Sequence, residues 1–130
     1  ATKRMCAVAI NRTRESEEMY LETILLLHRE HANVRAVDVG EELGYAKSSV
    51  SRGVNLLKDK GYIEIDPATG NITFTEAGKK KAEGVYERHR VITKALIKLG
   101  AEEHVAEENA CRIEHVVSDE LMAVLENFIA

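Results

Sequence analysis

The segment from residue 34 to residue 75 constrains the fold more than any other part of this chain. Its first part, Val34–Tyr45, has the length and periodicity of a short helix that Gly44 brings to an end. A second helix is expected from about Lys47 to Lys60. A short helix, a tight turn and a second helix have the build of a helix-turn-helix.

The periodicity changes immediately after these two helices. Residues 62–65 and 72–75 each alternate apolar and polar side chains, and the six residues between them read Asp-Pro-Ala-Thr-Gly-Asn, which is typical of a turn. A β-hairpin directly after the second helix of a helix-turn-helix is the wing of a winged helix-turn-helix. The sequence therefore predicts an N-terminal domain of that type.

The second helix of this motif has two distinct edges. Val50, Val54 and Leu57 make an apolar edge, and the opposite side is rich in small hydrogen-bonding side chains. Such side chains let a helix enter the DNA major groove, where an arginine can bind both acceptors of guanine. A plain amphipathic helix with a solvated face is the alternative. The candidate DNA-binding residues are Lys47, Ser48, Ser49, Ser51, Arg52 and Asn55.

Gly53 interrupts the same helix, where it costs about 1 kcal/mol relative to alanine. Close packing or a close backbone approach is therefore expected at this position.

The charge is distributed unevenly along the chain. The net charge is −4, but residues 1–81 hold 13 Lys and Arg against 12 Asp and Glu, whereas residues 82–130 hold 5 against 10. The first part is thus +1 and the second −5. Residues 45–60 contain four basic side chains and one acid, a local basic element that is compatible with DNA binding.

A second notable stretch is Glu107–His115, which is expected to be helical. Cys111, Glu114 and His115 follow an i, i+3, i+4 spacing, so they share one face of such a helix. A thiol, a carboxylate and an imidazole on one face are three potential metal ligands; a solvated polar face is the alternative. His104, Glu107 and Glu108 share this face, and the expected buried stripe consists of Ala106, Ala110, Ile113 and Val117.

The remaining segments also have helical patterns. Residues 1–15 are expected to form a basic arm, and Ser16 followed by two glutamates predicts a helix that runs to about Glu30. A long helix is expected from Lys79 to about Leu99, and a last one starts at Ser118. Leu121, Val124, Leu125 and Phe128 of the last helix are expected to form an interface or a core edge.

A family resemblance rests on the order of several short motifs. Glu18-Met19-Tyr20-Leu21 precedes the winged helix-turn-helix, and Arg88-His89-Arg90, Ala110–His115 and Ser118-Asp119-Glu120 follow it. In this order the chain, from about residue 16 to 130, resembles the diphtheria toxin repressor and manganese transport regulator family of metal-activated repressors, in its two-domain form.

The resemblance implies a fold and a set of partners. The fold is mainly α: an N-terminal winged helix-turn-helix with a short β-hairpin wing, at residues 16–78, followed by an all-helical metal-binding and dimerisation domain at 79–130. The implied partners are a second copy of the chain and a pseudo-palindromic double-stranded DNA operator. A cytoplasmic location fits the two widely separated cysteines and the absence of an apolar run long enough to span a bilayer.

The resemblance also implies which residues bind metal. Met19 joins Cys111, Glu114 and His115 at one ion, and His89 belongs to a second site nearby. In the iron-regulated branch an acid follows the His89 position by four residues and a histidine precedes the Cys111 position by four, but this chain has Thr93 and Glu107 there. The second site is therefore a hybrid in which Glu107 and Glu22 are candidate ligands; Glu22 matches a carboxylate used by the manganese branch.

The nature of the ligands indicates the metal. Thioether and thiolate sulfur favour Fe(II), Co(II) and Ni(II) over Mn(II), so Fe(II) is the expected activator, with Co(II) or Ni(II) active in vitro. Mn(II) is the alternative, since two carboxylates favour it. Two further alternatives are a metal-free regulator in which Cys111 senses oxidants and a metallohydrolase with Glu114 as its base. No His-Glu-x-x-His motif supports the hydrolase.

Overall fold

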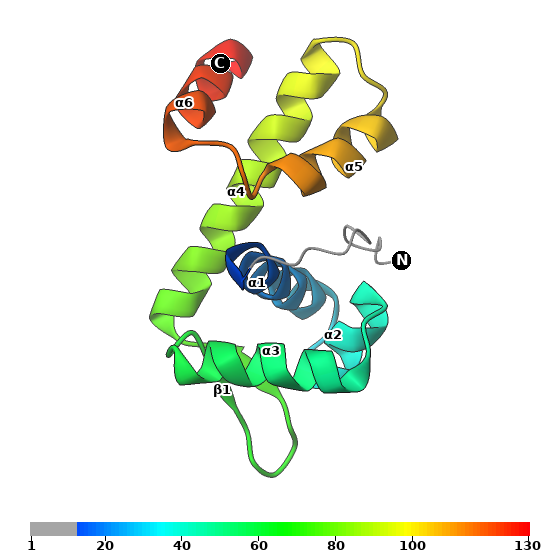
Figure 1. Ribbon diagram of the computed structural model, residues 1–130, viewed down its shortest axis with the longest axis vertical. Helices are drawn as coiled ribbons and strands as arrows, with labels where there is room; N and C mark the ends of the chain where they lie inside the picture. Colours follow the sequence, from blue (N-terminus) through cyan, green and yellow to red (C-terminus); the bar gives the residue numbers. More distant parts are fainter. Residues whose placement is uncertain (1–12) are drawn as a thin grey trace. The chain divides into compact units, whose positions relative to one another are not determined.

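The computed structural model describes residues 13–130, so residues 1–12 of the expected N-terminal arm lie outside the described part of the chain. The chain divides into two compact units, with the boundary between Glu83 and Gly84. The elements are α1 (Thr13–Glu30), α2 (Ala36–Leu43), α3 (Lys47–Asp59), β1 (Ile63–Ile65), β2 (Ile72–Phe74), α4 (Glu76–Lys98), α5 (Glu103–Ile113) and α6 (Asp119–Ile129), and Figure 1 labels all of them except β2.

Helix α1 supplies the central packing surface of the first unit. Its Tyr20, Ile24 and Leu27 are buried. The helix starts at Thr13 rather than at Ser16, so the last three residues of the expected arm are helical. No glycine or proline lies between Thr13 and Ser16 to end the helix there.

Helices α2 and α3 form the predicted helix-turn-helix. Gly44 ends α2 with φ +72°, and its N–H donates to the Gly40 carbonyl at 2.8 Å, which is the left-handed helix end that the sequence predicts. On α3 the buried residues are Val50, Val54 and Leu57, again as predicted. The apolar edge of α3 therefore faces the core of its own unit.

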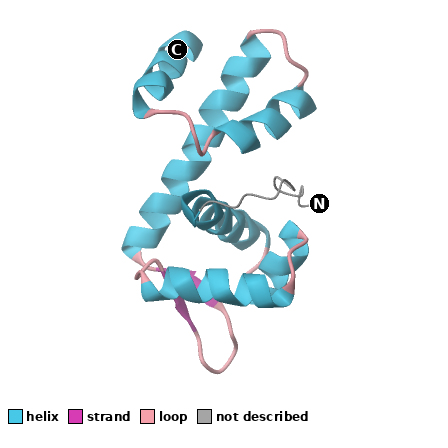
Figure 2. Ribbon diagram, viewed as in Figure 1, coloured by secondary structure: helices cyan, strands magenta, loops and turns pink. Residues whose placement is uncertain are grey.

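The two strands pair as an antiparallel hairpin directly after α3, drawn in magenta in Figure 2. Ile63 pairs with Phe74 and Ile65 pairs with Ile72. The hairpin is also tied to the segment before α2, since the Ile72 N–H donates to the Val34 carbonyl at 2.7 Å and the Val34 N–H donates to Asn71 Oδ1 at 2.8 Å. These bonds hold the wing against the body of the winged helix.

Helix α4 begins at Glu76, three residues before Lys79, where the sequence predicts its start. Gly78 explains how the helix can start so close to the hairpin. A Cβ built on Gly78 would lie 1.8 Å from the Tyr62 carbonyl oxygen, so only glycine allows this approach. The helix ends before Gly100, whose φ of +115° is in the left-handed region.

The second unit has its own small core. Val91, Ile92, Ala110 and Met122 are buried together, and Leu125 and Ile129 of α6 pack against them. The Ser118 hydroxyl accepts a hydrogen bond from the Leu121 N–H at 3.1 Å and so caps α6 at the predicted position. The prediction of a mainly helical chain with a winged helix and a helical second part is confirmed.

Three of the four apolar side chains expected at an edge of α6 remain exposed within the chain. Leu121, Val124 and Phe128 are exposed, whereas Leu125 packs against the core. Among residues 13–130, none of the helices combines the length and the apolar character needed to cross a bilayer.

Candidate metal centre and nucleic-acid interface

The polar side of α3 is accessible in the first unit. Its exposed side chains include Ser51 and Arg52, and the Asn55 amide donates to the Ser51 carbonyl at 2.8 Å. Ser49 is partly buried, because its carbonyl faces α1 and accepts a hydrogen bond from Tyr20. The exposed candidates for DNA contact are Lys47, Ser48, Ser51, Arg52 and Asn55.

Gly53 is packed tightly against α1, which confirms the expectation of close packing. A Cβ at this position would lie 2.1 Å from Cε2 of the Tyr20 ring. Burial raises the pKa of the Tyr20 phenol, and the neighbouring Tyr45 raises it further, so the hydroxyl stays protonated and donates to the Ser49 carbonyl at 3.3 Å. The sequence pattern contained no signal for this role of Tyr20.

The basic residues at the far end of α3 differ in their environment. Lys58 is exposed, whereas Lys60 donates to Glu17 at 2.5 Å and is thereby tied to α1. Glu17 also pairs with Lys81 at 3.5 Å, and the Lys81 ammonium lies 5.4 Å from the centroid of the Tyr62 ring. One carboxylate of α1 therefore engages two lysines, Lys60 and Lys81.

In the second unit, α5 ends earlier than the sequence suggests. The helix stops at Ile113, and residues 114–116 form a turn in which the Val116 N–H donates to the Ile113 carbonyl. The expected buried stripe is therefore partly wrong. Ala106 and Ala110 are buried, but Ile113 is 36% exposed, and Glu114 and His115 are buried instead.

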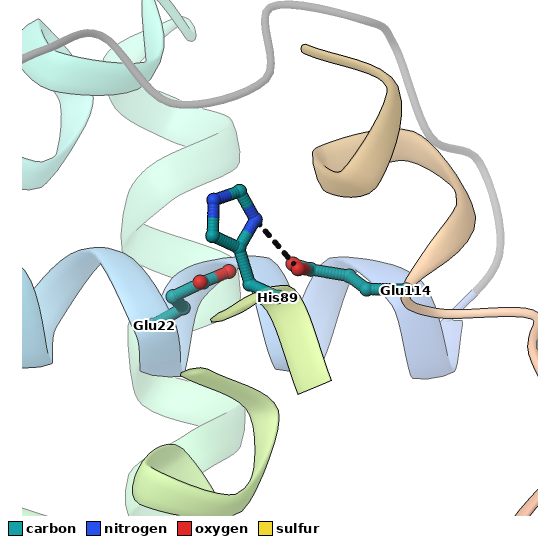
Figure 3. Close-up of side chains that lie close together, drawn as sticks. All are labelled: Glu22, His89 and Glu114. Atoms are coloured by element: carbon teal, nitrogen blue, oxygen red, sulfur yellow. Dashed lines mark hydrogen bonds and ion pairs between the residues drawn. The ribbon is translucent and has the colours of Figure 1, made fainter. Parts of the chain in front are cut away.

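Glu114 lies between two imidazoles. Its Oε2 is 2.9 Å from Nδ1 of His89, the pair joined by the dashed line in Figure 3, and its Oε1 is 3.3 Å from Nε2 of His115. Glu114 and His115 are 0% and 2% exposed. The turn at the end of α5 thus directs both side chains inward, and Glu114 contacts the histidine of α4.

Arg88 holds this turn in place. Its guanidinium donates to the Glu114 carbonyl at 2.9 Å and to the Val117 carbonyl, and it pairs with Asp119 at 3.3 Å. These bonds hold the C-cap residue Glu114 and the segment between α5 and α6 to α4. The sequence placed Arg88 in a motif but gave no indication that it organises the connection from α5 to α6.

The remaining candidate ligands lie on two different units. Cys111 is buried on α5, and Glu107, one turn earlier, is partly exposed. Met19 and Glu22 are buried side chains of α1 in the first unit, and Figure 3 labels Glu22 on that helix. His104 and Glu108, which were placed on the ligand face, are exposed to solvent.

The donor set of the second unit suits a divalent transition metal. Imidazole nitrogen and carboxylate oxygen are within contact distance of one another, and a thiol lies on the last turn of α5. Ions such as Fe(II), Co(II) and Ni(II) accept all three donor types. Burial of Glu114 excludes bulk water, which strengthens the attraction between a cation and its carboxylate. The side chains present are therefore compatible with a metal centre.

Both parts of the chain match models of one protein family. The N-terminal DNA-binding domain of the iron-dependent repressors matches residues 12–70, and their metal-binding and dimerisation domain matches residues 75–130. An uncharacterised HTH-type transcriptional regulator of Methanocaldococcus jannaschii is 33% identical over 88% of this chain and 93% of its own length. The transcriptional regulator MntR of an Escherichia coli O6:H1 strain is also 33% identical, over 88% of this chain and 74% of its own.

This chain belongs to the diphtheria toxin repressor and manganese transport regulator family. Its fold agrees with that assignment. The solved structure of a manganese-dependent transcriptional repressor in complex with manganese superimposes with a TM-score of 0.80 at 26% identity, over 87% of this chain and 52% of that one. The protein is thus a metal-dependent, DNA-binding transcriptional repressor, and its family is one of regulators rather than enzymes.

Proposed function

We propose that this protein is an iron(II)-activated repressor that acts as a cytoplasmic homodimer on a pseudo-palindromic operator and controls genes of metal uptake or homeostasis. The observation that carries the proposal is the buried carboxylate of Glu114 between His89 and His115. A side chain so placed on a DNA-binding regulator is suited to sense a cation rather than to stabilise the fold, since burying a carboxylate is costly.

The proposed ligands form two neighbouring sites. Cys111, Glu114 and His115 are the ligands of the first, with Met19 of α1. His89 belongs to the second, where Glu107 and Glu22 are the candidate carboxylates. The 2.9 Å contact between His89 and Glu114 supports the proximity of the two sites, because Glu114 is within reach of both.

The proposed mechanism depends on ligands from both units. Met19 and Glu22 lie on α1, which packs against the DNA-reading helix α3, whereas the other ligands lie on α4, α5 and the turn after α5. A bound ion supplies the positive charge that allows the acidic ligands to converge. If one ion were held by Met19 and His115 together, it would fix α1, and with it α3, in an orientation that fits the operator. By linkage, operator DNA then increases the affinity for metal by the same factor as metal increases the affinity for DNA.

The proposed preference for iron rests on sulfur. Met19 provides a thioether and Cys111 a thiol, and both disfavour Mn(II) relative to Fe(II), Co(II) and Ni(II). Mn(II) is the second candidate, favoured by Glu22 and by the likeness to a repressor whose solved structure contains manganese. Burial of Cys111, at 4% exposure, argues against the alternative in which this thiol senses oxidants, since a reactive thiol needs access.

The test replaces sulfur by oxygen at both positions, in the double variant Met19→Asp and Cys111→Glu. Operator affinity is titrated with Fe(II) and with Mn(II) under anaerobic conditions. Wild type is expected to respond to Fe(II) at lower concentration than to Mn(II), and the double variant to shift the ratio toward Mn(II). Equal responses of wild type to the two ions, or an unchanged ratio in the double variant, would show that sulfur does not set the selectivity.

A further inference from the structure

Tyr20 contacts one particular turn of the recognition helix in two ways. Its hydroxyl donates to the Ser49 carbonyl at 3.3 Å, and its ring covers the Cα of Gly53, four residues later. In an α-helix the carbonyl of residue 49 also accepts from the N–H of residue 53, so both contacts act on the same hydrogen-bonded turn. The turn that they enclose carries Ser51 and Arg52 on its exposed side.

The Tyr20 ring packs against α3 too closely to leave room for a side chain at Gly53. A Cβ on Gly53 would lie 2.1 Å from Cε2, 2.6 Å from Cζ and 2.9 Å from Cδ2 of Tyr20, which no side chain can tolerate. The ring is itself held, since Tyr45 packs edge-on against it with 6.1 Å between centroids and Tyr20 is 6% exposed. Neither α3 nor the ring can therefore shift without a change in the other.

We propose that Tyr20 is a positioning residue for DNA recognition: its ring and hydroxyl clamp the turn Ser49–Gly53 of α3 and thereby set how Arg52 is presented to a base. The inference rests on the proposed function in one respect, namely that α3 reads the operator. Tyr20 does not touch DNA in this scheme. Base contacts depend on side-chain placement much more than phosphate contacts do, so the clamp affects sequence preference rather than overall affinity.

A residue that acts in this way gives a particular result when its hydroxyl is removed. Tyr20→Phe keeps the ring against the Cα of Gly53 and loses only the hydrogen bond to the Ser49 carbonyl. The affinity of the full-length protein, loaded with Co(II), is measured for its operator and for a scrambled duplex. We expect the operator affinity to fall by about 3- to 10-fold, the effect of one neutral hydrogen bond, with scrambled-duplex affinity and Co(II) affinity unchanged. Tyr20→Leu, which also removes the ring, is expected to lower the preference further.

The contact between the Tyr20 ring and Gly53 is tested by a double-variant cycle in thermal unfolding. Gly53→Ala alone is expected to lower Tm strongly, because its Cβ cannot coexist with the ring. In a Tyr20→Ala background the same substitution is expected to raise Tm, since the clash is gone and alanine is the better helix former. Tyr62→Phe is the matched control, because its ring contacts Lys81 and the atoms nearest a Cβ on Gly53 all belong to Tyr20.

The outcomes separate the clamp from the proposed function. If Arg52→Ala loses operator preference while Tyr20→Phe and Tyr20→Leu retain it, α3 reads DNA but Tyr20 does not position it, and the inference is overturned. If Arg52→Ala also retains the preference, the assignment of α3 as the reading helix fails and the clamp fails with it. If Gly53→Ala lowers Tm equally in the wild-type and the Tyr20→Ala backgrounds, the Tyr20 ring does not pack against Gly53.

Discussion

Two polar groups, one in each unit, follow the same helical spacing and end up in opposite environments. On α3, Ser48, Ser51 and Arg52 are spaced i, i+3, i+4 and face solvent, as their periodicity predicts. At the end of α5, Glu114 and His115 have the same kind of spacing relative to Cys111, yet all three are buried. The difference lies in what each group can pair with inside its own unit.

The polar side of α3 has no need of internal partners because water solvates it. At the end of α5 the chain leaves the helix after Ile113, and α4 offers His89 to the Glu114 carboxylate and Arg88 to its backbone carbonyl. Polar spacing alone therefore indicates a shared face, whereas partners on a neighbouring helix decide whether that face is inside or outside. The first group is placed to meet an external ligand and the second to enclose one.

Replacing His115 tests most directly whether the buried polar group at the end of α5 binds metal. His115→Ala is expected to remove metal-dependent operator binding and reduce affinity to that for non-specific DNA, a loss of about 10³-fold or more. The matched control is His104→Ala, which removes an exposed histidine of the same unit and is expected to change neither metal nor operator affinity. The measurement is an operator titration in the presence of Co(II), with Co(II) binding followed in parallel.

A parallel substitution tests the ligand proposed on the other unit. Met19→Leu keeps the buried volume of Met19 and removes its sulfur, so the protein is expected to remain folded and to lose metal response. Normal metal-dependent operator binding by both Met19→Leu and His115→Ala would exclude a single ion held by the two units.

Two glycines of α4 stand in different surroundings, Gly78 crowded against Tyr62 and Gly84 open. Gly78→Ala is expected to lower the free energy of unfolding by more than about 3 kcal/mol, because its Cβ would collide with the Tyr62 carbonyl oxygen. Gly84→Ala is the control on the same helix; a Cβ there has no neighbour within 4 Å, so a gain of about 0.5–1 kcal/mol is expected. Denaturant unfolding of both variants provides the test, and equal effects would contradict the close approach at Gly78.

Basic residues of α3 are expected to divide into two functional classes. Arg52→Ala is predicted to cost about 1–3 kcal/mol of operator binding and to relax the preference at one base position. Lys58→Ala is predicted to weaken binding to all sequences equally and to reduce the salt slope by about one ion. Binding of a panel of operator variants at several salt concentrations distinguishes them. A uniform loss for Arg52→Ala would place Arg52 among the phosphate contacts.

The fold follows closely from local sequence rules. Gly44 and Gly100 end helices in the left-handed conformation, Ser118 caps α6, and the alternating segments around residues 66–71 form the hairpin. Each of these signals acts over a few residues, so it can be recognised in the sequence without knowledge of tertiary contacts. The exceptions are the starts of α1 and α4. Helix α4 begins directly after Thr75, whose hydroxyl caps it by accepting a hydrogen bond from the Gly78 N–H at 3.1 Å.

The site was less predictable, for a physical reason. The spacing of Cys111, Glu114 and His115 identified candidate ligands, but it assumed that α5 continued through His115. The turn that follows Ile113 is held by Arg88, which is distant in sequence and binds the Glu114 and Val117 carbonyls. The contact of Tyr20 with Gly53 is equally long-range. Interactions of this kind leave no periodic trace, so the three-dimensional structure is needed to find them.

We propose that a divalent metal held by the buried ligands switches operator binding on. The most direct measurement is an anaerobic titration of operator DNA with wild-type protein that has been freed of metal, with Fe(II) added, with Mn(II) added, and with chelator added after Fe(II). The predicted result is weak binding without metal, tight binding at the lowest metal concentration with Fe(II), and release by chelator. Tight operator binding by the metal-free protein that chelator does not reverse would contradict the claim.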